Sequence, residues 1–316
     1  MGMPELPEVQ TTVDGVKRHL VGLRVKDAWT DYRSCFHDGK DNIKDPAYFA
    51  YLKKHVKGAE IVGASRRGKN VLIHLSNGKT ILIHMKMTGH VMYGKYEKRK
   101  PAKGAEGAAR ETWLATEAGP LRDDPFNRFI HFALILSNGR HMVLSDMRKF
   151  AKVTLVDTDK IAESLHLSEH GPEPLEKNFG ADELRQAAFT RPNGAIKTVL
   201  MNHQVVSGIG NIYSDEILWR AGIHPLQPVK SIPSKKWPLI WKAMRETLRK
   251  GIDFGGDSMS DYRDILGERG KFQDEHNAYR KTGERCSKPG CKGAIVRLKI
   301  GGRSAHFCDI HQKLIK

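Results

Sequence analysis

The sequence contains few cysteines and no long apolar run, and each shortage excludes a class of protein. Four cysteines in 316 residues are too few for a small secreted scaffold held together by disulfides. Apolar runs such as VLIHL and ILIHM are far shorter than the roughly 18 residues that a membrane-spanning helix needs. Residues 1–25 lack the uninterrupted apolar core of a signal peptide. We therefore expect a soluble cytoplasmic protein that has no membrane partner.

Acidic residues are also in short supply relative to basic ones. The chain has 53 Lys and Arg against 36 Asp and Glu, a net charge of +17, and its pI is near 9.7. Such a surplus creates a positive potential that attracts polyanions. We expect nucleic acid as the partner, and in a bacterium an association with the nucleoid. The length is sufficient for two domains and a cleft between them.

The chain opens with MGMPELPEVQ, which begins a predicted helix. Apolar residues from Val9 to Leu20 recur at helical spacing, Pro7 suits a first-turn position, and Gly22 suits the end. If Pro4 were the first residue, its secondary amine would be a nucleophile, because an α-amino pKa of about 7.7–8.0 leaves a useful fraction neutral. The positive helix end disfavours the ammonium form, and Glu5 could shuttle protons.

This amine chemistry depends on the start of translation. A start at Met1 locks Pro4 in a peptide bond, whereas a start at Met3 followed by its removal frees the amine. We expect the second case. A secondary amine that attacks C1′ of a nucleotide displaces the base and leaves an iminium, which promotes loss of phosphate. Lys69, at the mouth of a predicted strand in SRRGKNVLIH, could assist, although a strand-end lysine is usually only exposed.

Two similar segments, NVLIHLSNGKTILIHMKMTG and FALILSNGRHMVLSDMRKF, are predicted hairpins that turn on Ser-Asn-Gly at 76–78 and 137–139. The ninth residue after each turn glycine is distinctive, namely Met87 and Arg148, and Phe150 follows two residues later. If the hairpins are neighbours, these side chains emerge at one edge. The alternation by itself favours Met87 and Phe150 as ordinary core residues.

The composition and the predicted secondary structure change twice in the remainder of the chain. Residues 94–124 are rich in Gly, Ala, Lys and Glu and are predicted to form a mobile loop with solvated charges. From about residue 160, helices are predicted near 182–189, 195–203, 211–222 and 236–251. A Gly-rich turn, HQVVSGIGNIYSDE, precedes the third helix, whose predicted cap is Asn211. Such a turn suits a phosphate, although glycines at tight turns are usually only steric.

The last 31 residues contain a predicted metal site. Three of the four cysteines lie there, and CSKPGC and CDIH form two close pairs that match a tetrahedral structural zinc site. The predicted ligands are Cys286, Cys291, Cys308 and His311, with His306 as an alternative to His311. Thiolates and imidazole favour zinc over harder metals. The fourth cysteine, Cys35, is predicted to be a small hydrophobe.

The zinc segment is also basic. Residues 276–316 contain ten Lys and Arg against two acidic residues, a net charge of +8. Arg303 follows two glycines, where the backbone can approach a duplex closely. We therefore expect a basic hairpin at this end of the chain.

Together these motifs resemble the formamidopyrimidine-DNA glycosylase group (Fpg, also called MutM), whose sister is endonuclease VIII. The resemblance covers nearly the whole chain and rests on PELPEV, RRGKNVLIH, HMKMTG, DMRKF, GPEPL, QVVSGIGNIYSDEILWRAGIHP and GGRSAHFC. It implies an α+β fold: an N-terminal β-sandwich flanked by helices (4–160), a helix-two-turn-helix domain (161–278) and a zinc hairpin (279–316). It also implies a monomer that binds double-stranded DNA containing oxidised bases or abasic sites.

The resemblance implies an activity and a role for each candidate residue. The activity is that of a bifunctional glycosylase and AP lyase that excises 8-oxoguanine and formamidopyrimidines by β,δ-elimination. Pro4 would form the Schiff base, with Glu5 as acid and base, Lys69 assisting β-elimination and Arg303 the δ-elimination. Two residues, Lys197 and Asn211, would hold phosphates. Met87, Arg148 and Phe150 would fill the gap left by the everted nucleotide, which reverses the preference for core.

Two other functions remain open at this point. One is an endonuclease VIII-like glycosylase for oxidised pyrimidines, and the other is a non-catalytic zinc-dependent DNA-binding protein in which Pro4 stays blocked. The sequence also departs from the family in five places. His311 replaces a usual Cys, Lys86 a small residue, Phe129 a frequent His and Ala305 a common Thr, and the 94–124 insert is longer than usual.

Overall fold

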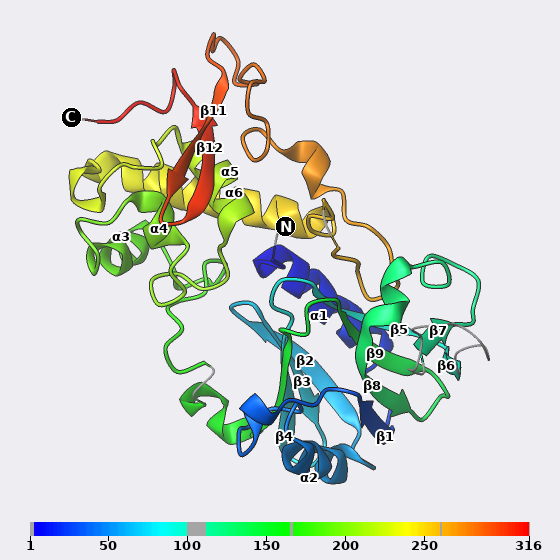
Figure 1. Cartoon of the computed structure of the whole chain (residues 1–316). Coiled ribbons are helices and arrows are strands. Elements are labelled where there is room, and N and C mark those ends of the chain that lie inside the picture. The colour runs from blue at the N-terminus through cyan, green and yellow to red at the C-terminus, as the bar shows by residue number, and fades with distance from the viewer. Residues whose placement is uncertain (1–2, 100–111, 165–166, 260, 316) are drawn as a thin grey trace.

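The computed structural model describes residues 3–99, 112–164, 167–259 and 261–315, and it has two lobes (Figure 1). One lobe is built from strands with two helices, and the other from helices and a C-terminal hairpin. No helix among the described residues has the length and apolar character to cross a membrane. The α+β class predicted from the sequence is confirmed.

The N-terminal lobe contains two four-stranded antiparallel sheets, in the orders β1-β8-β9-β5 and β10-β4-β3-β2. The first comprises β1 (Val25–Thr30), β5 (Gly89–Gly94), β8 (Ile130–Leu136) and β9 (His141–Asp146). The second comprises β2 (Ile61–Arg67), β3 (Asn70–Leu75), β4 (Lys79–His84) and β10 (Lys152–Asp157). Alternate apolar residues of both sheets enter one buried cluster, so the main core lies between the sheets.

Two helices, α1 (Leu6–His19) and α2 (Pro46–Val56), flank these sheets. The predicted first helix is confirmed, with Pro7 in its first turn and Gly22 just beyond its end at φ 88°. Both predicted hairpins are also confirmed, β3–β4 in one sheet and β8–β9 in the other. Three short 3₁₀ turns complete this lobe: Cys35–His37, Pro125–Phe129 and Thr158–Glu163. Cys35, which was predicted to be a small hydrophobe, is exposed.

The segment 94–124 is more ordered at its ends than the prediction of a mobile loop. Strands β6 (Tyr96–Arg99) and β7 (Thr112–Ala115) pair antiparallel. Trp113 is buried and meets Trp29 edge to face at 5.2 Å between ring centroids, a geometry that adds to the apolar burial. The strand pairing holds the two ends of the segment together, and the contact with Trp29 attaches them to β1. Residues 100–111 lie outside the described part of the chain.

The helical lobe contains α3 (Ala181–Phe189), α4 (Ile196–Leu200), α5 (Asn211–Ala221) and α6 (Trp237–Asp253), as predicted, although α4 is shorter. Short 3₁₀ turns lie at Val229–Ser231, Ser234–Lys236 and Phe272–Glu275. A second buried cluster, which includes Tyr213 and Trp237, forms the core of this lobe. The hairpin β11 (Ile295–Ile300) and β12 (Arg303–Cys308) lies against α5 (Figure 1).

Helix α1 connects the two lobes. Val9, Val13 and Val16 belong to the core between the sheets, whereas Leu6 belongs to the core of the helical lobe. The backbone N–H of Leu6 donates to the carbonyl oxygen of Gly208 at 2.9 Å. The start of α1 is therefore held at the boundary between the lobes, and with it the residues that precede the helix.

Candidate active site

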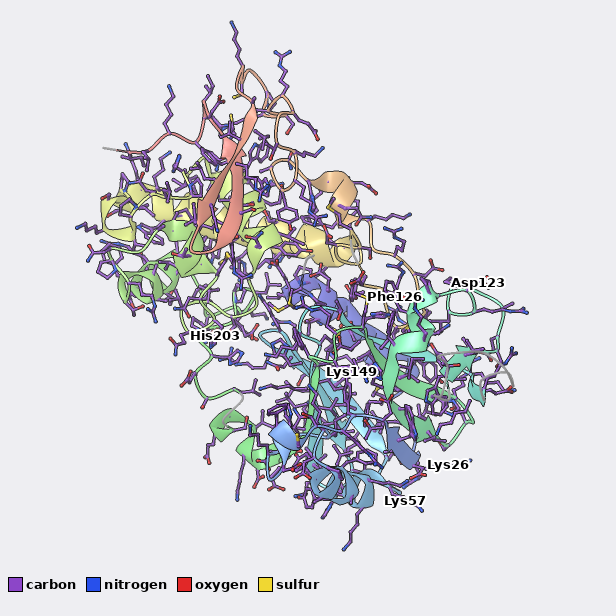
Figure 2. All side chains as sticks on the ribbon, in the orientation of Figure 1. Lys26, Lys57, Asp123, Phe126, Lys149 and His203 are labelled. Carbon is purple, nitrogen blue, oxygen red and sulfur yellow. The ribbon has the colours of Figure 1, made fainter. Side chains whose placement is uncertain are left out.

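A cavity of about 710 Å³ lies at the boundary between the lobes. Five of its lining residues were singled out from the sequence: Glu5, Lys69, Met87, Asn211 and Arg303. They come from the start of α1, the β2–β3 turn, the loop after β4, the start of α5 and the tip of the C-terminal hairpin. The fold thus assembles at one place groups that are hundreds of residues apart in the chain. Figure 2 labels His203, another lining residue, on the helical-lobe side of this boundary.

The carboxylate of Glu5 caps helix α5 from the other lobe. It accepts hydrogen bonds from the backbone N–H groups of Gly210 at 2.6 Å, Ile212 at 2.9 Å and Tyr213 at 3.3 Å. Gly210 is the N-cap residue and Asn211 the first residue of the helix, so the prediction that Asn211 caps α5 is wrong. A charged carboxylate at the positive end of a helix satisfies several free N–H groups at once. The Glu5 carboxylate therefore takes the place of the capping side chain that a residue next to the helix usually provides.

Gly210 is required for this arrangement. A Cβ atom added there would lie 2.4 Å from Cδ of Glu5, so any side chain would push the carboxylate away from the helix. Burial raises the pKa of the Glu5 carboxyl, and the charge of Lys69 and the three N–H donors oppose that rise. A buried carboxyl whose pKa is shifted upward in a cavity is typical of a group that exchanges protons during catalysis.

A second buried carboxyl, Glu8, supports the first. It accepts from the backbone N–H of Glu5 at 2.8 Å, from the Tyr213 hydroxyl at 2.7 Å and from the backbone N–H of Asp257 at 2.7 Å. Burial and then the nearby charge of Glu5 raise the pKa of Glu8 to about 7. Sequence reasoning did not assign Glu8 a role. Its signal is the three-residue spacing from Glu5, which is that of a capping box.

Pro4 and Met3 lie at the mouth of this arrangement. Pro4 is buried next to Glu5, and Met3 lines the cavity. In this chain, the nitrogen of Pro4 is part of the peptide bond with Met3.

Lys69 lies in the two-residue turn between β2 and β3, directly before β3 as predicted. The turn is held in place by Glu173. This carboxylate accepts from the backbone N–H of Gly68 at 2.6 Å and pairs with Arg66 at 2.6 Å and Arg67 at 3.1 Å. Gly68 has φ +56°, and a side chain there would clash with His170. The position of the Lys69 backbone is therefore firmly defined.

The charges around Lys69 set its proton affinity. Burial lowers the pKa of the Lys69 ammonium, the charge of Glu5 opposes this, and Arg303 lowers it further. Arg303 is the first residue of β12 and is exposed, and it lines the cavity. The structure thus brings together Glu5, Lys69 and Arg303, three of the four residues that were predicted to be catalytic, beside the fourth.

Met87, Arg148 and Phe150 form one cluster at the edge where the two sheets meet. Met87 follows β4, and the other two follow β9. The Arg148 Nη1 lies 3.0 Å from the Met87 Sδ, and its guanidinium carbon lies 4.6 Å from the centroid of the Phe150 ring. Phe150 is 48% exposed, so it is not the core residue that the alternation alone favours.

Lys197 is inside the protein. Its ammonium donates to Asp215 Oδ1 at 2.5 Å, Ser214 Oγ at 3.1 Å and the carbonyl oxygen of Asn211 at 3.3 Å. Because its side chain is 1% exposed and its three donors are satisfied, the prediction of a direct phosphate contact by Lys197 is corrected to an internal role. A buried ammonium needs such partners. Lys197 positions the start of α5, where Asn211 faces the cavity.

His306 takes part in the same network. Asp215 Oδ2 accepts from the backbone N–H of His306 at 3.0 Å and lies 2.9 Å from its Nδ1. Asp215 therefore joins α4, α5 and β12 through two basic side chains, Lys197 and His306. Neither His306 nor Asp215 was predicted to have this role, and no local pattern signals it.

The C-terminal cluster brings together Cys286, Cys291, Cys308 and His311, whose ligand atoms all lie within 4.8 Å of one another. The Sγ atoms of Cys291 and Cys308 are 3.5 Å apart, and Cys286 Sγ lies 3.4 Å from His311 Nδ1. Two ligands on a tetrahedral zinc with 2.3 Å bonds would be about 3.8 Å apart. Three thiols and one imidazole at this spacing fit a metal ion.

The environment of His311 supports its place as the fourth ligand. Its Nε2 lies 3.1 Å from the carbonyl oxygen of Trp219 and donates to it, which leaves the Nδ1 lone pair for the metal. A carbonyl partner of this kind orients a ligating imidazole. Because His306 is engaged by Asp215, the structure selects His311 over His306.

Comparisons with known proteins agree along the whole chain. Residues 3–153 match the description "Formamidopyrimidine-DNA glycosylase N-terminal domain", and residues 170–263 match "Formamidopyrimidine-DNA glycosylase H2TH domain". Formamidopyrimidine-DNA glycosylase of Chloroflexus aggregans is 35% identical over 99% of this chain and 100% of its own. The Caulobacter vibrioides protein of the same name is 32% identical over 98% and 100%.

Solved structures give the same picture. A Lactococcus lactis Fpg mutant in complex with DNA containing Fapy-dG superimposes with a TM-score of 0.79 at 28% identity, covering 98% of this chain and 100% of that one. Lactococcus lactis Fpg in complex with DNA containing an abasic site superimposes with a TM-score of 0.78 at 28% identity, covering 98% and 99%.

Proposed function

Because the chain belongs to the formamidopyrimidine-DNA glycosylase family, we propose that Pro4, Glu5, Lys69 and Arg303 carry out its chemistry in the cavity between the lobes. The protein is a DNA glycosylase of base excision repair, and glycosylase and AP lyase activity together are standard for this family. The observation that carries the proposal is the position of Glu5. Its buried carboxyl, beside Pro4, faces the same cavity as Lys69 and Arg303.

The nucleophile is the amine of Pro4 after removal of the residues that precede it. Met3 lines the cavity, so breaking the Met3–Pro4 bond leaves the proline nitrogen facing the space that Met3 now occupies. The nitrogen lone pair attacks C1′, the bond from C1′ to the damaged base breaks, and the base leaves with the proton that the Pro4 nitrogen gives up. The sugar ring opens as Glu5 gives a proton to its ring oxygen, which leaves an iminium between Pro4 and C1′.

Strand cleavage follows from that iminium. Loss of a proton at C2′ expels the 3′ phosphate, and a second elimination expels the 5′ phosphate. Burial shifts the pKa of Glu5 upward and that of Lys69 downward, which makes the first a better proton donor and the second a better proton acceptor. Arg303, whose charge is exposed to the cavity, stabilises the leaving phosphate.

The remaining residues hold the DNA. Met87, Arg148 and Phe150 fill the gap left by the everted nucleotide, and Asn211 contacts a phosphate with the support of Lys197. Met87, Arg148 and Phe150, together with the PELPEV start, favour oxidised purines over oxidised pyrimidines in double-stranded DNA. The purine lesions are 8-oxoguanine and formamidopyrimidines. The protein acts as a monomer in the cytoplasm, at the nucleoid. Its three functional domains are the N-terminal β-sandwich (4–160), the helix-two-turn-helix domain (161–278) and the zinc hairpin (279–316).

The cluster of Cys286, Cys291, Cys308 and His311 holds one structural zinc ion. Zinc supplies a tetrahedral cross-link between the two ends of the hairpin. The four ligands come from the loop before β11 and from the end of β12 and the turn after it. By holding them, the site fixes the hairpin whose tip carries Arg303.

The test of the nucleophile compares two forms of the protein, one that begins at Pro4 and one that retains Gly2 and Met3, each verified by intact mass. Borohydride is added to each with a duplex that contains 8-oxoguanine. The form that begins at Pro4 should crosslink and cut the strand, whereas the longer form should bind without crosslinking and so act as a DNA-binding protein only. Equal trapping by both forms would exclude Pro4 and make Lys69 the first candidate. A panel with oxidised pyrimidines tests the lesion preference.

A further inference from the structure

One wall of the cavity carries positive charge that the described protein does not neutralise. This wall is the outer face of β4 and β10, where Lys152 is paired in register with His84, and Thr154 lies on the same face two residues further on. Lys86, just after β4, completes it, and all four residues line the cavity. Glu5 is the single carboxylate among the described lining residues, and it caps α5.

Lys86 occupies a backbone position that favours glycine. Its φ is 57°, in the left-handed region where a side chain is strained. Lysine at this position therefore carries a conformational cost that glycine would avoid. Strain that persists at one residue of a cavity points to a functional contact of its side chain.

The wall lacks partners for its polar groups. Among the described residues, the side-chain ammonium groups of Lys86 and Lys152 form no hydrogen bond and no ion pair. Burial lowers the pKa of Lys86, as do the charges of Lys152, Lys44 and Lys69. The hydroxyl of Thr154 is also without a partner, although that residue is only 1% exposed. Two ammonium groups without a protein partner and one unpartnered hydroxyl on the same wall suit an anion with several oxygen atoms.

A hydrogen bond orders the same wall. The backbone N–H of Lys86 donates to Nδ1 of His84 at 3.0 Å, so the neutral imidazole carries its proton on Nε2. Burial, followed by the charges of Lys86 and Lys69, keeps the pKa of His84 well below its usual value. The imidazole therefore adds no charge and fixes the backbone turn that carries Lys86.

We propose that Lys86, Lys152 and the Thr154 hydroxyl form a phosphate seat that binds a backbone phosphate of the damaged strand. This inference rests on the proposed function, because it places the seat in the cavity that receives the everted nucleotide. A phosphate is the anion that every duplex supplies beside its lesion, whatever the damaged base. The seat continues the positive wall from Lys69 and Arg303, which border the same cavity.

The test measures binding of duplexes that contain a tetrahydrofuran abasic analogue and one neutral methylphosphonate, moved one position at a time. The methylphosphonate at one of these positions should weaken binding of the unmodified protein about tenfold, the value expected for the loss of one charge-assisted hydrogen bond. Lys86→Gly should weaken binding of the all-phosphate duplex by a similar factor and remove the sensitivity at that position. It should also reduce the slope of log affinity against log salt by about one.

Two control variants separate this effect from changes in folding and charge. Lys149→Gly replaces another left-handed lysine, φ 56°, that does not line the cavity, and Lys57→Ala removes an exposed charge on the far side of the sandwich (Figure 2). Both should keep the methylphosphonate sensitivity of the unmodified protein. Lys86→Gly relieves strain, so its melting temperature should not fall. If it does fall, Lys86→Ser must give the same loss of sensitivity, or the proposal is overturned.

The same measurements also show whether the anion is a backbone phosphate or a group on the damaged base. If Lys86→Gly keeps full sensitivity at every methylphosphonate position, the phosphate seat is overturned. If the binding defect of Lys86→Gly instead appears only with a lesion base that carries a carboxylate, the wall binds the base and not a phosphate. The proposal is then likewise wrong. Borohydride trapping of the same preparations tests Pro4 separately, so either idea can fail without the other.

Discussion

Glu8 should make the stability of this protein fall as the pH rises. Burial and the charge of Glu5 raise the pKa of its carboxyl from 4.5 to about 7. The unfolded carboxyl ionises near pH 4.5, whereas the folded one keeps its proton to about pH 7. The stability contributed by that proton is therefore complete below pH 4.5, declines between the two values and is lost above pH 7. Linkage gives a loss of about 2.5 kcal/mol between pH 5 and pH 8.

Glu8→Gln tests this value, because the amide does not titrate. At pH 5 the variant should be less stable than the unmodified protein by about 1 kcal/mol, since its NH₂ group faces the N–H of Glu5 in place of an acceptor. By pH 8 the order should reverse, because the unmodified protein then contains an ionised, buried carboxylate. The assay is urea unfolding at pH 5, 6, 7 and 8, at constant ionic strength and equal metal content.

Glu183→Gln is the matched control. Glu183 occupies the same capping-box position at the start of α3, where it accepts from the N–H of Gly180 at 2.9 Å, but it is exposed. Its stability difference from the unmodified protein should stay constant over the four pH values. Parallel curves for Glu8→Gln as well would refute the reasoning, because they would mean that Glu8 keeps an ordinary carboxyl pKa in the folded protein.

Three further predictions concern the metal site, Arg148 and the buried ion pair between Lys197 and Asp215. Metal analysis should find one zinc per chain and less in His311→Ala, and chelation should weaken DNA binding by loosening the basic hairpin; undiminished zinc in the variant would remove His311 from the ligand set. Arg148→Ala should reduce the preference for lesion-containing over undamaged duplex more than it reduces affinity for undamaged duplex, and equal losses would make Arg148 a plain phosphate contact. Asp215→Asn should cost about 3–5 kcal/mol in urea unfolding because it leaves the Lys197 ammonium buried without its carboxylate. Adding Lys197→Met should recover part of that loss, and no recovery would mean that the ion pair is not the cause.

Local signals accounted for the elements that the sequence predicted correctly. The first helix follows from apolar spacing with Pro7 and Gly22 at its ends, and both hairpins follow from alternation around Ser-Asn-Gly turns. In the metal cluster, two close pairs of ligands are already near each other along the chain. In each case the residues that decide the structure lie within a few positions of one another, so their pattern is readable without the fold.

The predictions that failed involve partners far apart in the chain. The two ends of the segment 94–124 were assigned to a mobile loop because the pattern shows nothing of the β6–β7 pairing or of the contact between Trp29 and Trp113. Asn211 was taken as the cap of α5 because a cap is usually local. Lys197 was expected to contact a phosphate because the pattern does not show its buried partner Asp215, which lies 18 residues away.

The sequence by itself determined the charge of the protein, its main helices and hairpins, its C-terminal cluster of cysteines and histidine and its family, because each depends on composition or on short-range spacing. The tertiary structure alone decided how the site works. Glu5 caps a helix that begins more than 200 residues later, and its burial there raises its pKa and that of Glu8. Desolvation and the charges of distant neighbours depend on which surfaces meet, and these surfaces meet only when the two lobes fold against each other.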